Sequence, residues 1–235
     1  MSHLFLFDID FTLIRSRGVG SAAMNTAMHA LLGVEDAFVG VDFSGRTDRA
    51  IIRDALRNHG RTPDTDAFEA FIAAFEAVYI PALERELAAR GGAVLPGVRE
   101  MLDALRALPD ARLGVATGNF RRAAERKLRH FELDGYFSDG GFADDAEDRG
   151  ELVGIAIGRL GGAAGAPWRV FVIGDTSHDI MAARANNAVA VGVATGASSP
   201  ELLAAAGAAH VFNDLSDSAT VLRLLLGGAA PATRG

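Results

Sequence analysis

Short apolar runs alternate along the chain with longer stretches in which apolar residues recur every three or four positions. The short runs lie at residues 4–8, 113–116, 170–173, 189–193 and, more weakly, 210–212, and they predict buried strands. The longer stretches lie at residues 97–108, 121–131, 149–160, 179–186 and 200–206, and they predict helices. Strands that alternate with helices are typical of an α/β fold, a parallel sheet with helices on both faces.

Residues 16–90 depart from this pattern, because helix follows helix there and no strand pattern appears. The helices are expected at residues 21–32, 48–58 and 66–89. Thr47 or Asp48 is expected to cap the second helix, and Thr65 or Asp66 the third. Such a long helical insertion most simply forms a small bundle of its own. We therefore predict a core domain of residues 1–15 and 91–227, a helical cap domain of residues 16–90, and a disordered tail at 228–235.

The composition is that of a globular protein, with 49% hydrophobic and 23% charged residues among 235. The formal net charge of −7 argues against a nucleic-acid or anionic-membrane partner, since either favours a basic face. The absence of cysteine excludes disulfides and thiolate chemistry. The chain start has no basic leader, and no run of 18 apolar residues occurs, so a cytoplasmic enzyme is expected.

Polar residues follow three of the predicted strands. The first strand leads into Asp8-Ile9-Asp10-Phe11-Thr12, the second into Thr117-Gly118-Asn119, and the third into Asp175-Thr176-Ser177-His178-Asp179. In a parallel sheet the carboxyl ends of the strands share one edge, where ligands bind. We therefore expect four carboxylates, several hydroxyls and glycine backbone to meet at this edge.

Four neighbouring carboxylates repel one another unless a cation neutralises them. The donors are oxygen atoms, with neither cysteine nor a histidine cluster, and magnesium suits such a site best. A carboxylate beside magnesium can attack phosphorus. A second carboxylate two residues on can protonate the leaving alkoxide and then activate water. A hydroxyl, backbone N–H groups and a lysine would hold the phosphoryl oxygens.

These residues resemble the haloacid dehalogenase superfamily, specifically its phosphoglycolate phosphatase-like branch with a helical cap between the first two motifs. The resemblance extends from Leu4 to about Leu215 and implies a Rossmann-like core. It implies that Asp8 is the nucleophile and Asp10 the general acid/base. It also implies that Mg²⁺ binds Asp8, the backbone carbonyl of Asp10 and Asp175, with Asp179 in its first or second shell, and that Thr117, Gly118 and Lys127 bind phosphate.

Lys127 is the chain's single lysine among 23 basic residues, and the resemblance places a phosphate-binding lysine on the helix after Thr117. Arg149 is the replacement candidate for that role. In the cap, Arg46 precedes the second predicted helix, in a loop that reads the substrate in the family. Arg46 is therefore a candidate contact for a substrate anion or for the phosphate, or else a solvated residue beside a helix cap.

Two positions depart from the family pattern. Phe11 stands where glycine is usual, and it could reshape the turn or close part of the pocket. Asn186-Asn187 replaces a common pair of small residues after the fourth motif. Neither change removes a reacting group.

The residues present also bear on the other activities of the fold. Dehalogenation does not need Asp10, and a phosphonate hydrolase needs a cap lysine that this cap lacks. A sugar phosphomutase is weakened, because it typically has a cap lysine and histidine, but His29 and Arg46 keep it open. A catalytically silent binding protein would have lost Asp8, Asp10 or Asp175. Hydrolysis of a small phosphate monoester through an aspartyl-phosphate is therefore the function that the sequence favours.

Overall fold

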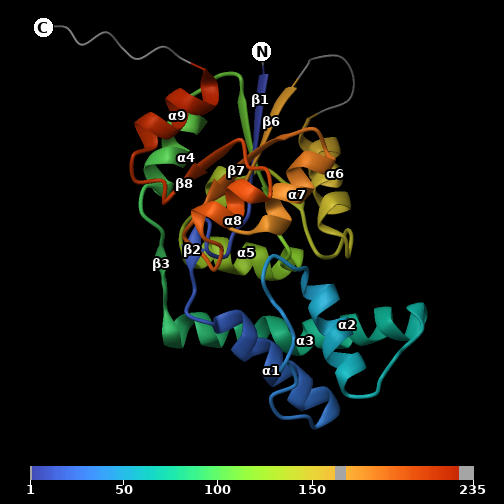
Figure 1. Cartoon of the computed structure of the whole chain (residues 1–235). Helices are drawn as coiled ribbons and strands as arrows, with labels where there is room; N and C mark the ends of the chain where they lie inside the picture. Colours follow the sequence, from blue (N-terminus) through green and yellow to red (C-terminus); the bar gives the residue numbers. More distant parts are fainter. Residues whose placement is uncertain (1, 162–167, 228–235) are drawn as a thin grey trace, which may run out of the picture.

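The computed structural model describes residues 2–161 and 168–227, so the predicted tail at 228–235 lies outside the described residues. Six parallel strands form one sheet in the order β5-β4-β1-β6-β7-β8 (Figure 1). The strands are β1 (Ser2–Phe7), β4 (Ala111–Ala116), β5 (Gly140–Gly141), β6 (Trp168–Gly174), β7 (Val189–Val193) and β8 (His210–Phe212). The predicted parallel α/β fold is confirmed. The sequence did not predict β5, because two glycines carry no strand signal.

Helices cover both faces of the sheet. One face packs against α4 (Val98–Arg106), α5 (Arg121–His130) and α9 (Ser218–Leu226), and the other against α6 (Arg149–Leu160), α7 (Ser177–Ala185) and α8 (Pro200–Ala205). A 3₁₀ turn, η1 (Asp134–Tyr136), follows α5. Along β1 the side chains alternate between these layers, because Phe5 and Phe7 belong to the first cluster and Leu4 and Leu6 to the second. All four are fully buried, as expected of a central parallel strand.

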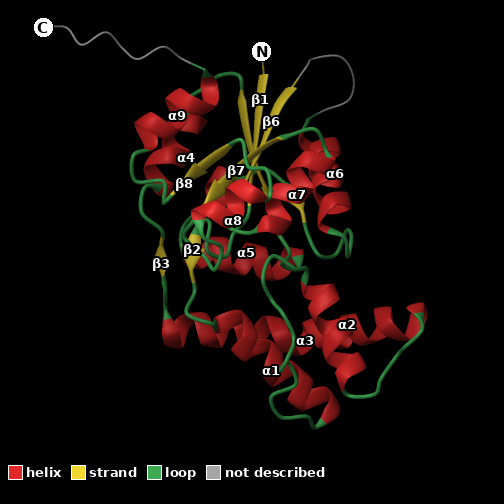
Figure 2. Ribbon diagram, in the orientation of Figure 1, coloured by secondary structure: helices red, strands yellow, loops and turns green. Residues whose placement is uncertain are grey.

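Three helices lie together beyond the carboxyl end of the sheet: α1 (Val19–Leu32), α2 (Asp48–Asn58) and α3 (Thr65–Arg90) (Figures 1 and 2). We call them the cap helices. Thr47 caps α2 by accepting a hydrogen bond from Ala50 N, as predicted. The predicted cap of α3 was wrong, since Asp64, rather than Thr65 or Asp66, accepts from Ala67 N.

A narrow two-stranded ribbon joins the sheet to the cap helices. In it, β2 (Ile14–Arg15) pairs antiparallel with β3 (Ala93–Val94). Gly92 follows α3 with φ of 151°, and a Cβ there would come within 2.8 Å of Phe131 Cζ and 3.2 Å of Ser16 Cα. Glycine therefore lets the returning strand lie close against the outgoing one. Both strands are too short for the sequence to predict them.

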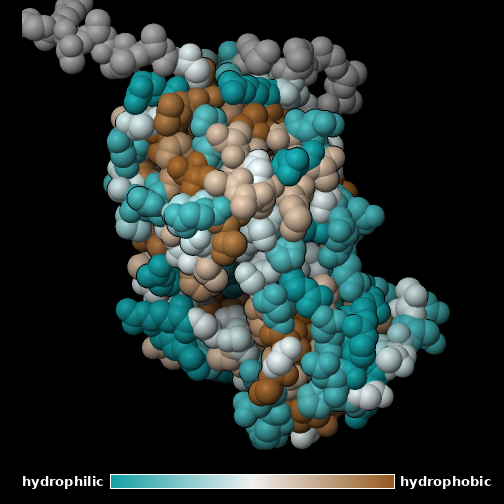
Figure 3. Space-filling model, viewed as in Figure 1, coloured by the Kyte–Doolittle hydropathy of each residue, from teal (hydrophilic) through white to brown (hydrophobic). Residues whose placement is uncertain are grey.

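The surface of the cap helices is mixed. On the face drawn in Figure 3, hydrophilic residues cover much of the cap, and apolar residues appear between them beside α1 and α2. Among the described residues, no helix combines the length and the apolar character needed to cross a membrane.

Candidate active site

Three neighbouring strands end at the site. In the order β4-β1-β6, Phe7 lies opposite Val115 on one side and Ile173 on the other. The next residues along these strands therefore emerge side by side, and Asp8 N donates a hydrogen bond of 2.9 Å to Ile173 O. Parallel pairing thus brings Asp8 close to the residues that follow β4 and β6.

Arg149, at the start of α6, joins two of the carboxylates. Its Nη2 lies 2.8 Å from Asp8 Oδ1 and 2.5 Å from Asp179 Oδ1, and it also donates to Ala116 O at 3.2 Å. All three charged residues are buried. Burial alone would lower the pKa of Arg149, but Asp179 and Asp8 raise it well above its ordinary value. Arg149 is therefore a permanent positive charge beside Asp8.

Lys127, on α5, forms a second network on the other side of the site. Its Nζ lies 2.5 Å from Asp10 Oδ2 and 2.6 Å from Asn119 Oδ1. Asn119 Nδ2 donates to Asp10 Oδ2 at 2.9 Å and to Thr117 Oγ1 at 2.8 Å. Burial alone would raise the pKa of Asp10, but Lys127, with hydrogen bonds from Asn119 and Ser16, holds it below its ordinary value. Asp10 is therefore ionised in this arrangement.

The carboxylates of Asp8, Asp175 and Asp179 gather in one buried group, with one oxygen of each within 4.8 Å of the others. Burial raises the pKa of Asp8 to about 6, although Arg149 opposes the shift. Burial and the neighbouring charges of Asp8 and Asp179 raise the pKa of Asp175 to about 8. A divalent cation would remove this repulsion, and an all-oxygen donor set fits Mg²⁺. The residues present therefore suit the metal that the sequence predicts.

Asp179 has both carboxylate oxygens engaged by the protein. Oδ1 accepts from Arg149, while Oδ2 accepts from Thr176 N at 3.1 Å and from Thr176 Oγ1 at 2.7 Å. Thr176 caps α7, and Asp179 completes a capping box as the third residue of that helix. Asp8 and Asp175 are therefore better placed than Asp179 to coordinate an ion directly.

The beginning of α2 rests on the core beside these networks. Asp48 N donates to Gly118 O at 2.6 Å, and Phe120 N donates to Asp48 Oδ2 at 2.8 Å. Farther along α2, Arg53 forms a bidentate ion pair with Glu147, with N–O distances of 2.8 and 2.9 Å. These contacts hold the cap helices against the core.

Two glycines allow that close approach. A Cβ on Gly118 would overlap Arg46 O, and a Cβ on Gly45 would overlap Thr176 Oγ1. Gly45 also has φ of 65°, in the left-handed region that glycine tolerates best. The loop before α2 therefore lies directly against the core loops, with Gly118 close to the backbone of Arg46 and Gly45 close to the side chain of Thr176.

A cavity of about 660 Å³ lies between core and cap. Its core wall carries both charged networks. Its cap wall carries three apolar residues, Met24, Phe43 and Ile51. The polar residues of that wall are Ser16, Ser21, Ser44, Arg46, Asp48 and Tyr79. Burial raises the pKa of Asp48 to about 7, against the opposing effect of Lys127. The two walls therefore offer a substrate very different surroundings.

Comparison with known proteins identifies the family. Residues 3–187 match the haloacid dehalogenase-like hydrolases. The chain belongs to this family. The resemblance predicted from the motifs is thus confirmed, and the hydrolase fold accounts for most of the chain.

Individual members of the family are similar at modest identity. A hydrolase from Pseudomonas syringae is 25% identical, with a TM-score of 0.70 and coverage of 95% of this chain and 99% of that one. A predicted phosphoglycolate phosphatase from Haemophilus somnus is 21% identical, with a TM-score of 0.65 and coverage of 94% and 97%. The tyrosine-protein kinase PtkA of Mycobacterium tuberculosis is 29% identical over 187 residues. That match includes 78% of this chain but 59% of PtkA, so the chain spans well under two thirds of this relative.

Most of the residues predicted from the family motifs lie together in this hydrolase. The cavity is lined by five of them: Asp8, Asp10, Gly118, Lys127 and Asp175. Thr117 and Asp179 are buried behind these residues, and both hydrogen-bond to members of the two networks. Lys127 pairs with Asp10, whereas Arg149, named only as a replacement candidate, pairs with Asp8. The protein therefore has one buried cation for each catalytic candidate.

Two cap residues lie differently from what a substrate contact requires. Arg46 lines the cavity, but its Nη1 is 2.5 Å from Asp54 Oδ2 on α2. His29 is largely exposed and pairs with Glu35 at 3.0 Å, away from the residues that line the cavity. Neither side chain is therefore free and directed at the reacting centre.

Sequence reasoning missed two residues of the site, Asn119 and Asp48. Asn119 was noted as polar, but its role in joining Asp10, Lys127 and Thr117 depends on side-chain orientations. From the sequence, Asp48 is expected only as a helix cap. Its position directly after Gly-Arg-Thr at the start of a cap helix was the available signal, since the loop was already expected to reach the site.

Phe11 occupies a backbone conformation that favours glycine, with φ of 59°. Its carbonyl oxygen accepts a hydrogen bond from Thr195 Oγ1, and its N–H donates to Ile14 O at 2.7 Å. The side chain is 44% exposed and lines the cavity. The turn therefore keeps its shape without glycine, and the aromatic ring narrows the edge of the cavity.

Proposed function

We propose that this hydrolase is a magnesium-dependent phosphatase that cleaves a small phosphate monoester through an aspartyl-phosphate on Asp8. The observation that carries the proposal is that Asp8 pairs with a buried arginine and also belongs to a cluster of three carboxylates, whose donor atoms are all oxygen. In this surrounding a carboxylate can act as a nucleophile toward phosphorus.

The protein groups account for both halves of the reaction. Asp8 Oδ attacks phosphorus, and the bond from phosphorus to the ester oxygen breaks while Asp10 gives its proton to the leaving alkoxide. Asp10 then takes a proton from water, which attacks the aspartyl-phosphate and releases inorganic phosphate from Asp8. Lys127 and Arg149 would stabilise the charge on the transferring group. Mg²⁺ held by Asp8 and Asp175 would neutralise the phosphate and the carboxylates.

Asp10 must be protonated before it can act as an acid, although Lys127 favours its ionised form. A phosphate dianion in the cavity adds negative charge close to Asp10, and this raises the pKa of the carboxyl group. Binding of substrate would therefore favour protonation of Asp10, which supplies the proton that the leaving group needs.

We also propose that residues 16–90 act as a cap domain over the core of residues 1–15 and 91–227. The short β2–β3 ribbon is the covalent link between them, and the α2 contacts with the core support a closed arrangement. Closing the cap excludes bulk water from the reacting phosphate and admits small substrates.

The test is hydrolysis of p-nitrophenyl phosphate by the purified chain, with Mg²⁺ and after its removal by EDTA. Activity is expected to need the metal and to fall at least ~10³-fold in Asp8→Asn. Asp10→Asn should also be inactive. The matched control is Asp139→Asn, because Asp139 pairs with Arg121 away from the cavity. Full activity of Asp8→Asn would contradict the covalent mechanism.

Two alternatives have weaker support. A phosphomutase would need cap groups that reorient a sugar, and His29 lies on an exposed pair with Glu35. Phosphoryl transfer involving tyrosine is suggested by the similarity to PtkA and is compatible with an apolar cap wall. Phosphotyrosine therefore belongs in the first substrate panel.

A further inference from the structure

The two walls of the cavity divide a bound phosphate monoester into two ends. Arg149, Lys127 and the carboxylate cluster occupy the core wall, where the phosphoryl group must lie if Asp8 attacks it. The leaving group then faces the cap wall. The chemistry of that wall should therefore select among esters of the same phosphate.

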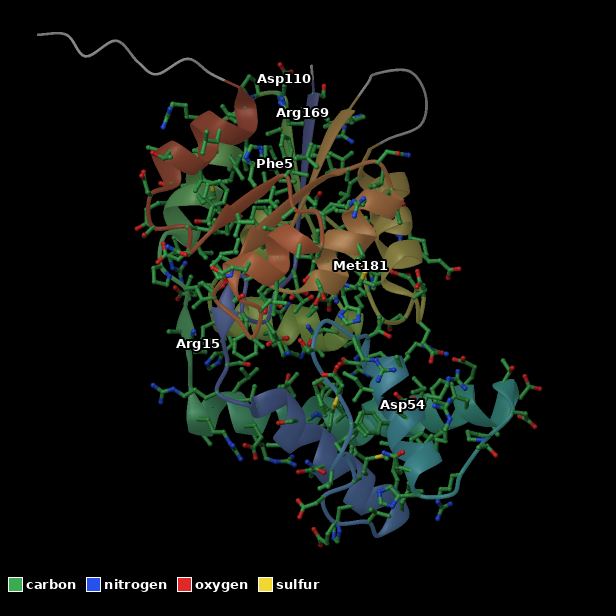
Figure 4. All side chains as sticks on the ribbon, in the orientation of Figure 1. Phe5, Arg15, Asp54, Asp110, Arg169 and Met181 are labelled. Atoms are coloured by element: carbon green, nitrogen blue, oxygen red, sulfur yellow. The ribbon has the colours of Figure 1, made fainter. Side chains whose placement is uncertain are left out.

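The cap wall offers little to a second anion. Among the described residues that line the cavity, Arg46 is the one cation from the cap, and its guanidinium pairs with Asp54. Asp54 projects from α2, as its label in Figure 4 shows. A carboxylate on the leaving group would have to compete with this ion pair.

Asp48 makes the cap wall less favourable for binding an anion. Its residue is 7% exposed, it lines the cavity, and one of its oxygens is fixed by Phe120 N. No hydrogen bond to its other oxygen, Oδ1, is found within residues 2–161 and 168–227. An acceptor that lines the cavity gains from a donor on the ligand, and in its ionised form it repels a ligand carboxylate.

Apolar side chains complete the surroundings of the leaving group. Met24, Phe43 and Ile51 line the cap side of the cavity, so a carbon skeleton is favoured there over a second phosphate or carboxylate. The wall thus combines apolar surface with uncharged serine and tyrosine hydroxyls and with one carboxylate, that of Asp48.

We infer that the substrate is a phosphate monoester whose leaving group is uncharged or cationic and donates a hydrogen bond to Asp48. Esters whose leaving group carries a carboxylate, phosphoglycolate among them, are discriminated against. This inference rests on the proposed phosphatase activity and specifies the substrate class of the same site.

The experiment compares three two-carbon esters of similar size and different charge: phosphoglycolate, ethylene glycol monophosphate and phosphoethanolamine. For each ester kcat/KM is measured, together with its Ki as a competitive inhibitor of p-nitrophenyl phosphate turnover, so that a slow substrate still gives a value. Wild type is expected to favour both donor-bearing esters over phosphoglycolate at least about tenfold. Which of the two is favoured more distinguishes a hydroxyl from an ammonium group.

Two variants test the residues that carry the inference. Asp48→Asn keeps an acceptor for Phe120 N but presents an amide to the cavity. It should lower the ratio of kcat/KM for the donor-bearing esters to kcat/KM for phosphoglycolate at least ~5-fold. Asp54→Asn releases Arg46. It should raise kcat/KM for phosphoglycolate at least ~3-fold relative to kcat/KM for the glycol ester. Glu69→Gln is the matched control, because it removes the same charge from the cap but frees Arg49, which does not line the cavity.

The outcomes separate the two proposals. Failure of wild type to hydrolyse p-nitrophenyl phosphate with Mg²⁺ would argue against the phosphatase itself. If the wild type hydrolyses p-nitrophenyl phosphate but its kcat/KM for phosphoglycolate equals or exceeds that for the two donor-bearing esters, the inference is overturned and the phosphatase proposal stands. An Asp48→Asn variant that folds, by circular dichroism, and keeps the wild-type preference would also overturn it.

Discussion

The core wall and the cap wall of the cavity enclose the same space with opposite chemistry. On the core side, each carboxylate of the reaction has a cation of its own, Arg149 for Asp8 and Lys127 for Asp10. On the cap side, Asp48 lies among apolar and uncharged polar residues, and Arg46, the one cation that lines the cavity from the described cap residues, pairs with Asp54. Fixed charges suit a phosphoryl group, which is the same in every substrate. A wall of apolar and uncharged polar side chains suits the part of the substrate that varies.

The largest effect on this contrast is expected from Arg149→Met. This change leaves Asp8 and Asp179 buried without their common partner, so the free energy of unfolding should fall by about 3–5 kcal/mol. We expect kcat for p-nitrophenyl phosphate to fall at least ~10²-fold even well below the melting temperature. Thermal unfolding and steady-state kinetics measure the two effects.

Arg149→Lys separates charge from geometry in the same experiment. A lysine keeps the positive charge but carries it on a shorter side chain without the fixed planar geometry of a guanidinium, so a partial loss of kcat is expected. Retention of full activity by Arg149→Met would show that the core wall does not depend on this pairing.

A smaller effect is expected where the two walls meet, in Gly118→Ala. The added Cβ would overlap Arg46 O, so the cap loop must lift away from the core. We expect kcat/KM for p-nitrophenyl phosphate to fall about tenfold, because a displaced cap excludes water less well. Gly135→Ala is the control, since a Cβ there meets nothing within 4 Å. Equal loss in both variants would argue against a specific role of the contact.

On the cap wall, Asp48→Asn should change how stability depends on pH. The pKa of Asp48 is raised in the folded protein to about 7, from 3.8, with burial as the main cause and Lys127, Asp10, Asp144 and Phe120 N–H as its neighbours. The folded state therefore holds a proton that the unfolded chain releases between these values. Its stability falls as the pH rises through this window and is constant above it.

Asparagine does not titrate, so the variant should gain stability relative to wild type as the pH rises. We expect a gain on the order of 2 kcal/mol in the difference between pH 8 and pH 4.5, from urea unfolding at both values. If the difference in unfolding free energy between variant and wild type is the same at pH 4.5 and pH 8, Asp48 is ionised at both pH values.

The smallest effect is expected at the edge of the cavity, in Phe11→Gly. Glycine relieves the cost of a positive φ but loses part of the contact of a half-exposed ring, and it makes the unfolded chain more flexible. A net stabilisation of about 0.5 kcal/mol should appear as a higher urea midpoint. A lower midpoint would mean that the ring's packing outweighs the backbone strain.

The sequence predicted the parts of the molecule in which local pattern and chemistry coincide. The five longest strands are short apolar runs, the core helices other than α9 and the cap helices show helical patterns, and Asp8 and Asp175 follow apolar strands directly. The short strands β2, β3 and β5 have no such period, because pairing with a neighbour alone defines them. The helix α9 was missed as well, since a nearly continuous apolar run shows no face.

Side-chain partners were harder to predict, because they depend on contacts distant in the sequence. Arg46 is drawn to Asp54, and Arg149 bridges Asp8 and Asp179 across three elements. The sequence named Lys127 for its rarity but could not show that it lies against Asp10. Geometry, rather than residue type, decides which charge pairs with which.

The burial of Lys127 has a consequence for the chemical labelling of this protein. The chain contains one lysine, and that side chain is 3% exposed, at the floor of the cavity. An acylating reagent that attacks amines would therefore find a single lysine in the fold, and this lysine is shielded in the arrangement described. If the proposed cap domain opens, the rate at which Lys127 is acylated would measure how often it does so.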